Sequence, residues 1–88
     1  MSWAYEFTPE AVRKLRDLGP SAAAEIKAYL ETRIIGAKDP RAYGKPLRHE
    51  LKGLWRYRVR EWRILCRLQD EVCIVVVIDA GHRSTVYD

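Results

Sequence analysis

Arginines at alternate positions are the most distinctive chemical feature of this sequence. They recur in the stretch Leu54 to Leu68, LWRYRVREWRILCRL, on both sides of Arg60-Glu61. The guanidinium group of arginine presents a planar fork of donors that fits phosphate oxygens. The pattern therefore favours a surface that binds a polyanion, although an exposed strand face is also commonly charged and solvated.

The other residues that could do chemistry are His82, Arg83 and Tyr87. Familiar signatures are missing: there is no Walker loop, GxSxG, HExxH or dinucleotide fingerprint. Arginines with a histidine and a tyrosine fit RNA strand cleavage, in which the ribose 2′-hydroxyl attacks the adjacent phosphate. The protein must then orient the attack, stabilise charge on the phosphorane and manage two protons. His82 could carry a proton, since its ordinary pKa lies near neutrality, or it could simply be a polar residue at a turn.

The same stretch predicts the elements that would position these arginines. Strict alternation is the period-two signature of a half-buried strand, so we expect two strands joined by a tight turn at Arg60-Glu61. Antiparallel pairing sets Val59 opposite Trp62, Arg58 opposite Arg63, Tyr57 opposite Ile64 and Trp55 opposite Cys66. One face then carries Trp55, Tyr57, Val59, Trp62, Ile64 and Cys66, which we interpret as core. The other carries Arg56, Arg58, Arg63 and Arg67, with Leu54 and Leu65.

Positive charge is concentrated around this predicted hairpin. The net charge is +4, from 16 basic and 12 acidic residues, and residues 41–67 hold nine basic residues against Glu50 and Glu61. A field concentrated in this way favours nucleic acid or an acidic protein as the partner. The candidate RNA-binding residues are Lys45, Arg48, Lys52, Arg56, Arg67 and His82.

The 88 residues predict one domain, residues 1–88, with a single core. No apolar run reaches the roughly 18 residues that a transmembrane helix needs, and the N-terminus lacks a signal-peptide pattern. We therefore expect a cytoplasmic protein with no membrane partner.

Cys66 and Cys73 would face each other if Gln69-Asp70 were a two-residue turn, but a cytosolic location predicts free thiols. Without CxxC spacing they indicate no metal site, and we expect no cofactor.

The N-terminal half predicts a strand followed by two helices. Ser2 to Phe7 alternates aromatic residues with others, and Thr8-Pro9-Glu10 is typical of a helix start. Gly19 should end the first helix and Gly36 the second. The apolar positions expected to be buried are Val12, Leu15 and Leu18 in the first helix and Ala23, Ile26, Leu30 and Ile34 in the second.

The remaining segments complete an α+β fold. Residues 37–52 have turn chemistry throughout and predict a loop, whereas residues 72–78, VCIVVVI, predict a central strand covered on both faces. We expect this strand to break at Asp79 and a short last strand or extended tail to follow at residues 84–87. The predicted architecture is an N-terminal strand, a helical hairpin and a three- to four-stranded, mostly antiparallel twisted sheet, with the helices on one face.

Several of these segments, in this order and spacing, resemble the RelE/ParE toxin superfamily. They are GLWRYRV at 53–59, WRIL at 62–65, VCIVVVIDAGHR at 72–83 and TVY at 85–87, with the TPE helix start and PL at 46–47. RelE-like members are ribosome-dependent mRNA endonucleases that an antitoxin neutralises, and ParE-like members share the fold but poison DNA gyrase. The resemblance implies a RelE-like toxin whose partners are an acidic, amphipathic antitoxin segment and mRNA in the ribosomal decoding site. It also implies a hetero-oligomer with the antitoxin.

The resemblance also implies roles for single residues. Arg63 and Arg83 match the arginines that clamp the phosphate, and Arg58 and Arg56 match basic positions beside it. Tyr87 matches a C-terminal tyrosine that stacks on a base or holds the 2′-hydroxyl. We therefore take Arg58, Arg63, Arg83 and Tyr87 as the candidate catalytic residues.

Two departures from the family pattern leave alternatives open. Arg56 and Arg58 stand where the best-studied pattern has lysines, and arginine essentially cannot shed a proton, so the general base is unassigned. The spacing from Arg83 to Tyr87 is also two residues shorter. A gyrase inhibitor that does no chemistry, and an inactive relative that only binds a partner, are therefore the competing hypotheses.

Overall fold

The computed structural model describes residues 2–82. Its helices are α1 (Pro9–Leu18) and α2 (Pro20–Tyr29), and α2 runs on into a π-helical turn (Leu30–Ile34). Its strands are β1 (Ala4–Phe7), β2 (Lys45–Pro46), β3 (Trp55–Val59), β4 (Trp62–Gln69) and β5 (Ile74–His82). Short 3₁₀ turns occur at Pro40–Ala42 and His49–Leu51. Within the described residues, no helix is long and apolar enough to cross a membrane.

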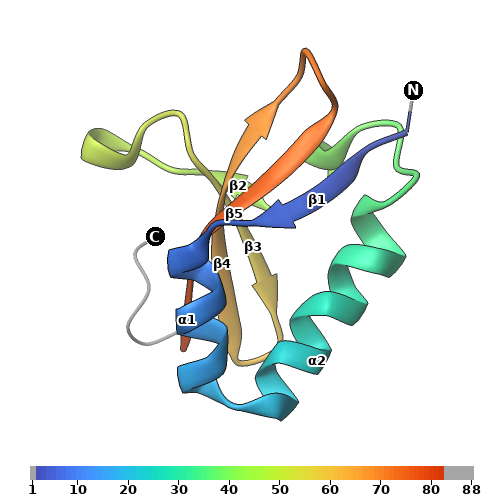
Figure 1. Ribbon diagram of the computed structural model, residues 1–88. Helices are drawn as coiled ribbons and strands as arrows, with labels where there is room; N and C mark the ends of the chain where they lie inside the picture. Colours follow the sequence, from blue (N-terminus) through green and yellow to red (C-terminus); the bar gives the residue numbers. More distant parts are fainter. Residues whose placement is uncertain (1, 83–88) are drawn as a thin grey trace.

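The strands form one five-stranded sheet in the order β1-β5-β4-β3-β2. The β1–β5 pair is parallel and the other three pairs are antiparallel. Figure 1 shows the two helices side by side against the sheet, where α1 contacts β5 and α2 contacts β3. The α+β prediction of a mostly antiparallel sheet with a helical hairpin on one face is confirmed.

The helix boundaries follow the predicted capping residues. The Thr8 Oγ1 atom accepts a hydrogen bond from the Ala11 N–H at 3.1 Å, which satisfies one of the free donors at the start of α1. Gly19 ends α1 with a φ of 102°. Gly36, with a φ of 78°, ends the second helical segment and donates its N–H to the Trp3 carbonyl. The left-handed φ at both positions is one that glycine adopts without strain.

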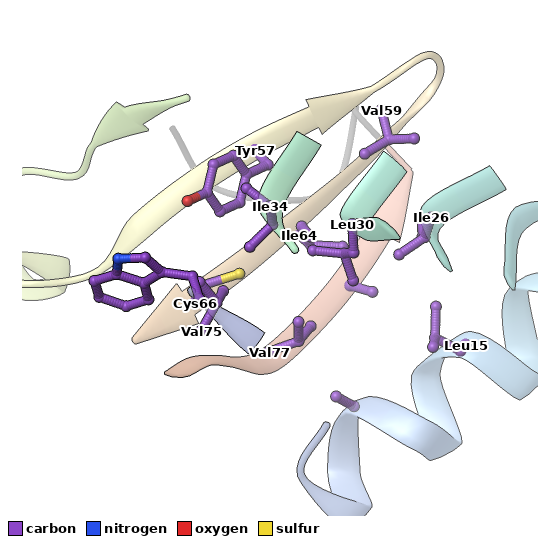
Figure 2. Close-up of a cluster of buried hydrophobic side chains, with 13 residues drawn as sticks. Leu15, Ile26, Leu30, Ile34, Tyr57, Val59, Ile64, Cys66, Val75 and Val77 are labelled. Atoms are coloured by element: carbon purple, nitrogen blue, oxygen red, sulfur yellow. The ribbon is translucent and has the colours of Figure 1, made fainter. Parts of the chain in front are cut away.

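The core lies between the helices and the sheet (Figure 2). Leu15 of α1 and Ile26, Leu30 and Ile34 of the second helical segment pack against side chains from β3, β4 and β5. The fully buried sheet residues of this cluster are Tyr57, Ile64, Cys66, Val75 and Val77. Of the hairpin face predicted as core, Tyr57, Val59, Ile64 and Cys66 are buried, and Trp55 and Trp62 are partly buried against the cluster.

The prediction that Val12 is buried was wrong, and the two-residue turn that would make the two cysteines face each other is not present. Val12 is 41% exposed, and the buried residue in its place is Ala11. A small side chain lets α1 approach β5 closely, which a β-branched valine would prevent. Cys66 pairs with Val77 rather than Cys73, because the turn after β4 is longer than two residues and Cys73 lies within it. Both cysteines are free.

Two segment boundaries also differ from the prediction. The segment expected to be a loop contains β2, whose Lys45 and Pro46 pair with Arg56 and Trp55. Strand β5 does not break at Asp79 but continues to His82, with an irregularity in the β4–β5 register between Leu65 and Cys66. The last strand or tail predicted for residues 84–87 lies outside the described residues.

Candidate active site

The β3–β4 hairpin brings Arg58 and Arg63 directly opposite each other. All four residue pairs predicted for this hairpin are present in the register. Arg60 occupies the turn with a φ of 55°, a left-handed conformation that a side chain rarely adopts. In the next row of the sheet Lys45 of β2 pairs with Arg56 of β3. Three neighbouring strands therefore contribute cations to one face.

Arg63 occupies the middle of this basic face. Arg58 stands opposite it on β3, and Gly81 stands opposite it on β5. Gly81 carries no side chain, so β5 adds no bulk beside Arg63 at this point of the ladder. An arginine fork suits a phosphate group.

The arginines of this face differ in exposure. Arg63 is 8% exposed and Arg56 is 9% exposed, whereas Arg58 is exposed. Arg63 lies on β4, which has a neighbouring strand on both sides. A charge that is shielded from water interacts more strongly with an anion than a fully solvated one does.

Arg58 lies where the sheet is open on its outer side. The two-residue strand β2 covers only Trp55 and Arg56 of β3. Beyond that point Arg58 lines a hollow of about 250 Å³ with Tyr29, Lys45 and others, and a second hollow of about 580 Å³ with Tyr29, Arg33 and others. The Arg58 side chain is thus accessible from the basic face and from the edge of the sheet.

The loop that carries Lys45 is tied to the sheet by side chains of β3. The Tyr57 hydroxyl donates to the Pro40 carbonyl at 2.8 Å, and the Trp55 indole N–H donates to the Tyr43 carbonyl at 2.7 Å. Burial, the largest cause, raises the pKa of Tyr57, so this hydroxyl stays protonated as a donor. These contacts fix β2 and so place Lys45 beside Arg56.

A close backbone approach and an ion pair complete this anchoring. A Cβ atom at Gly44 would collide with the Arg56 carbonyl oxygen, so only glycine allows the loop to approach β3 there. Arg41 donates two hydrogen bonds to the Asp70 carboxylate, at 2.7 and 2.9 Å. These hydrogen bonds are the main reason that the pKa of Asp70 is lowered.

The other predicted RNA-binding residues lie farther from the Arg58–Arg63 pair. Arg67 is exposed on β4, opposite Val76, four residues and roughly 13 Å along the strand from Arg63. Arg48 and Lys52 flank the 3₁₀ turn at His49–Leu51. Figure 1 shows this yellow-green loop projecting away from the sheet. The structure therefore groups Lys45 and Arg56 with the pair, but not Arg48, Lys52 or Arg67.

His82 lies on the opposite side of the sheet from Arg63. It pairs with Trp62 at the end of β5, and the two rings meet edge to face with centroids 5.7 Å apart. The Trp62 indole N–H donates to Glu25 of α2 at 3.2 Å. Glu61, the carboxylate in the hairpin, is exposed in the turn. The structure thus brings neither His82 nor Glu61 together with the arginine pair.

Arg83 and Tyr87, the remaining predicted catalytic residues, lie outside the described residues. Sequence reasoning also missed a group beside the site, formed by Tyr29, Arg33 and Tyr43. The Arg33 guanidinium lies 5.8 Å from the ring centroids of both Tyr29 and Tyr43. The only signal in the sequence was the i, i+4 spacing of Tyr29 and Arg33, which places them on one helix face.

The described residues contain no group of three His, Cys, Asp or Glu side chains that could hold a metal ion. An anionic phosphate could be held between Arg58 and Arg63, with Arg56 and Lys45 neutralising neighbouring charge.

Comparisons with known proteins agree with this picture. Residues 5–87 match the family described as the ParE toxin of type II toxin–antitoxin system, parDE. The chain is 33% identical to Toxin RelG of Mycobacterium tuberculosis over 87 residues, which cover 99% of this chain and 98% of RelG.

Solved structures are similar over nearly the whole chain. The RelBE2 toxin–antitoxin complex of M. tuberculosis contains a chain that matches with a TM-score of 0.80 and 32% identity, covering 96% of this chain and 94% of that one. A mutant of the E. coli toxin RelE in the free state matches with a TM-score of 0.74 and 23% identity, covering 97% and 88%. The chain therefore belongs to the RelE/ParE superfamily of toxins of type II toxin–antitoxin systems.

Proposed function

We propose that this toxin is a ribosome-dependent mRNA endonuclease that cleaves by attack of a 2′-hydroxyl on the adjacent phosphate. The observation that carries the proposal is the Arg58–Arg63 pair, opposed across the ladder with Gly81 beside it. Like charges directly opposite each other destabilise a sheet, so a pair kept in this position is well explained by a phosphate that binds between them.

In the proposed reaction the substrate supplies its own nucleophile. The 2′-oxygen bonds to phosphorus, the bond from phosphorus to the 5′-oxygen breaks, and the products are a 2′,3′-cyclic phosphate and a 5′-hydroxyl. Arg63 holds the phosphate and stabilises the charge that develops on it, and Arg58 neutralises its outer oxygen. Arg56 and Lys45 orient the neighbouring backbone.

Two protons must also move, one from the 2′-hydroxyl and one to the leaving 5′-oxygen. Arginine is a poor proton carrier, because its pKa lies above 12. His82 does not fill this role, because it faces Trp62 on the opposite side of the sheet, so the general base stays unassigned. Arg83 and Tyr87 keep their proposed roles at the phosphate and the neighbouring base.

Cleavage mapping tests this proposal. The purified chain is added to ribosomes that translate a defined message, and new 5′ ends are located by primer extension. We expect cuts in register with the decoding site that Arg63→Ala abolishes and Arg63→Lys reduces, because lysine keeps the charge but loses the fork. The matched control is Arg13→Ala, which removes an exposed arginine on α1. No cuts from the folded wild-type protein would refute the proposal.

A gyrase inhibitor is the second candidate, because the matching family description names parDE. It predicts DNA breaks that depend on gyrase, and these breaks should survive Arg63→Lys, since a protein-binding surface needs no phosphate fork. Gyrase-dependent breaks without RNA cuts would establish this candidate. Neither activity from a folded chain would support an inactive binding relative.

We also propose that a cognate antitoxin covers the basic face with an acidic, amphipathic segment. The structural relative RelBE2 is a complex of toxin and antitoxin. Arg58 is the exposed member of the arginine pair, so Arg58→Glu should weaken the complex by at least tenfold at low salt. Arg13→Glu is the control for the change in net charge. Equal affinities of the two variants, measured by calorimetry, would contradict this mode of neutralisation.

A further inference from the structure

A groove runs between the second helical segment and the outer edge of β3. It consists of the two hollows that share Tyr29 and Arg58, and its basic residues include Arg33, Lys45 and Arg60. We propose that this groove, here called the α2–β3 groove, binds the single-stranded RNA that flanks the phosphate held by Arg58 and Arg63. The inference rests on the proposed ribonuclease function and extends it to how the substrate strand is held.

The groove is continuous with the candidate active site. Arg58 lines both hollows and also stands opposite Arg63 in the ladder. In the part of the chain that the structure describes, β2 covers β3 only at Trp55 and Arg56, so the outer edge at residues 57–59 has no neighbouring strand. An RNA strand that leaves the phosphate site on this side crosses that edge and enters the groove.

The groove has planar side chains suited to unstacked bases. Tyr29 lines both hollows, and Tyr43 lines a neighbouring hollow that shares Arg33 with the groove. The ring centroids of Tyr29 and Tyr43 each lie 5.8 Å from the Arg33 Cζ atom. Tyr43 is 38% exposed, and Arg33 is exposed. Aromatic rings and guanidinium planes are the groups on which proteins stack single-stranded bases. These side chains therefore offer stacking and cationic contacts in the groove and directly beside it.

The charge and the apolar content favour RNA over an acidic protein segment. Among the described residues that line the two hollows, Glu25 alone is acidic, and it already accepts a hydrogen bond from Trp62 and lies 3.8 Å from Arg60. Asp39, in the neighbouring hollow with Tyr43, already accepts a hydrogen bond from the Arg41 N–H. The aliphatic side chains there are Ala28 and Val59, and Val59 is only 5% exposed. A docked helix would need an apolar anchor pocket, which these two residues do not provide.

The test is direct binding of RNA in the absence of ribosomes. The probe is a fluorescein-labelled 12-nucleotide RNA with 2′-O-methyl riboses, which lack the nucleophile and cannot be cut. Fluorescence anisotropy gives its affinity at several salt concentrations for the wild type and for Arg33→Gln, Tyr43→Leu and Arg13→Gln. Arg13→Gln removes the same charge from an exposed site on α1 and is the matched control. A thermal melt checks that each variant is folded.

We expect the two groove variants to weaken RNA binding for different reasons. Arg33→Gln should lower the slope of log affinity against log salt by about 0.7 and weaken binding about fivefold at 0.1 M salt, because one phosphate contact is lost. Tyr43→Leu should weaken binding about fivefold or more with the slope unchanged, because stacking is lost. If Tyr43→Leu does not fold, Arg33→Gln decides the test alone, since its side chain is exposed.

The outcomes separate this inference from the proposed function. The inference is wrong if the wild type does not bind the probe, or if Arg33→Gln binds it as the Arg13→Gln control does. Unchanged RNA binding with weakened binding of a protein partner would reassign the groove to that partner. Conversely, weakened RNA binding in the groove variants, together with no ribosomal cleavage by the wild type, would refute the nuclease proposal and leave the groove as an RNA site.

Discussion

Replacing Arg58 with glutamine should stabilise this protein while it impairs RNA cleavage. Arg58 and Arg63 are directly opposite each other, and like charges in that position cost about 0.2 to 1 kcal/mol. Arg63 is only 8% exposed, so water screens the repulsion poorly and we expect about 0.5 to 1 kcal/mol. Glutamine keeps a similar length and removes the charge.

That free energy is large enough to measure by thermal denaturation. A change of 1 kcal/mol shifts the Tm of a domain of this size by about 4 to 8 °C, so Arg58→Gln should raise the Tm by about 2 to 8 °C. The gain should shrink between 0.05 and 1 M salt, because the Debye length falls to about 3 Å at 1 M. RNA cleavage by Arg58→Gln should fall about 100- to 1000-fold, because an enzyme typically loses that much rate when it loses one hydrogen-bond donor to the charge that develops in the transition state.

Arg67→Gln is the matched control for this prediction. Arg67 is an exposed strand arginine that stands opposite Val76, so its replacement relieves no opposed charge. A Tm of Arg58→Gln equal to or below that of Arg67→Gln at low salt would refute the repulsion argument. A Tm gain without any loss of cleavage would instead remove Arg58 from the reaction.

Three further predictions concern stability. Tyr57→Phe leaves the Pro40 carbonyl without its donor in a buried place and should lower the free energy of unfolding by about 1 to 3 kcal/mol, whereas an unchanged urea midpoint would contradict this. Burial raises the pKa of Cys66 and of Tyr57, so the folded state binds these protons more tightly than the unfolded state does. The stability that both groups contribute is complete below the ordinary thiol pKa of 9.0 and decreases as the pH rises above it. In thermal melts, the Tm of Cys66→Ala should therefore decrease less steeply above about pH 9 than the Tm of the wild type does. The pKa of Asp70 is lowered, mainly by its hydrogen bonds from Arg41. The stability that ionised Asp70 contributes is therefore present above the ordinary pKa of 3.8 and is lost as the pH falls through the lowered pKa. Asp70→Asn should therefore flatten the acid limb of a Tm-against-pH curve, and an identical limb in both proteins would refute this.

The hairpin could be predicted residue by residue because its information is local. Alternation fixes which side chains share a face, and a tight turn fixes the register, so the Arg58–Arg63 pairing follows from fewer than 20 consecutive residues. The helix caps at Thr8 and Gly19 are equally local. In contrast, Ala11 is buried instead of Val12 because of how closely α1 approaches β5, which no single segment encodes.

The parts of the site that could not be predicted depend on contacts between distant segments. Strand β2 has only two residues and no periodicity, and it is held in place by hydrogen bonds from Trp55 and Tyr57 to the preceding loop. The α2–β3 groove combines Arg33 with Arg58, which are far apart in the sequence. Asp79 was read as a break, yet its carboxylate accepts the Ala80 N–H and lies 3.6 Å from Lys14, which lets β5 continue.

The parallel pairing of β1 with β5 has a consequence for how the chain folds during synthesis. It joins Ala4 to Ile74, and β5 is also the strand that joins β1 to β4. Contacts between residues so far apart form late, because a long loop must close before they contribute. A nascent chain that ends before β5 therefore has its helices and its arginine hairpin but no continuous sheet beneath α1. We expect such a chain to form the local Arg58–Arg63 pairing but to leave the other edge of β4 without a partner, so that Arg63 gains its Gly81 neighbour only after β5 has been made.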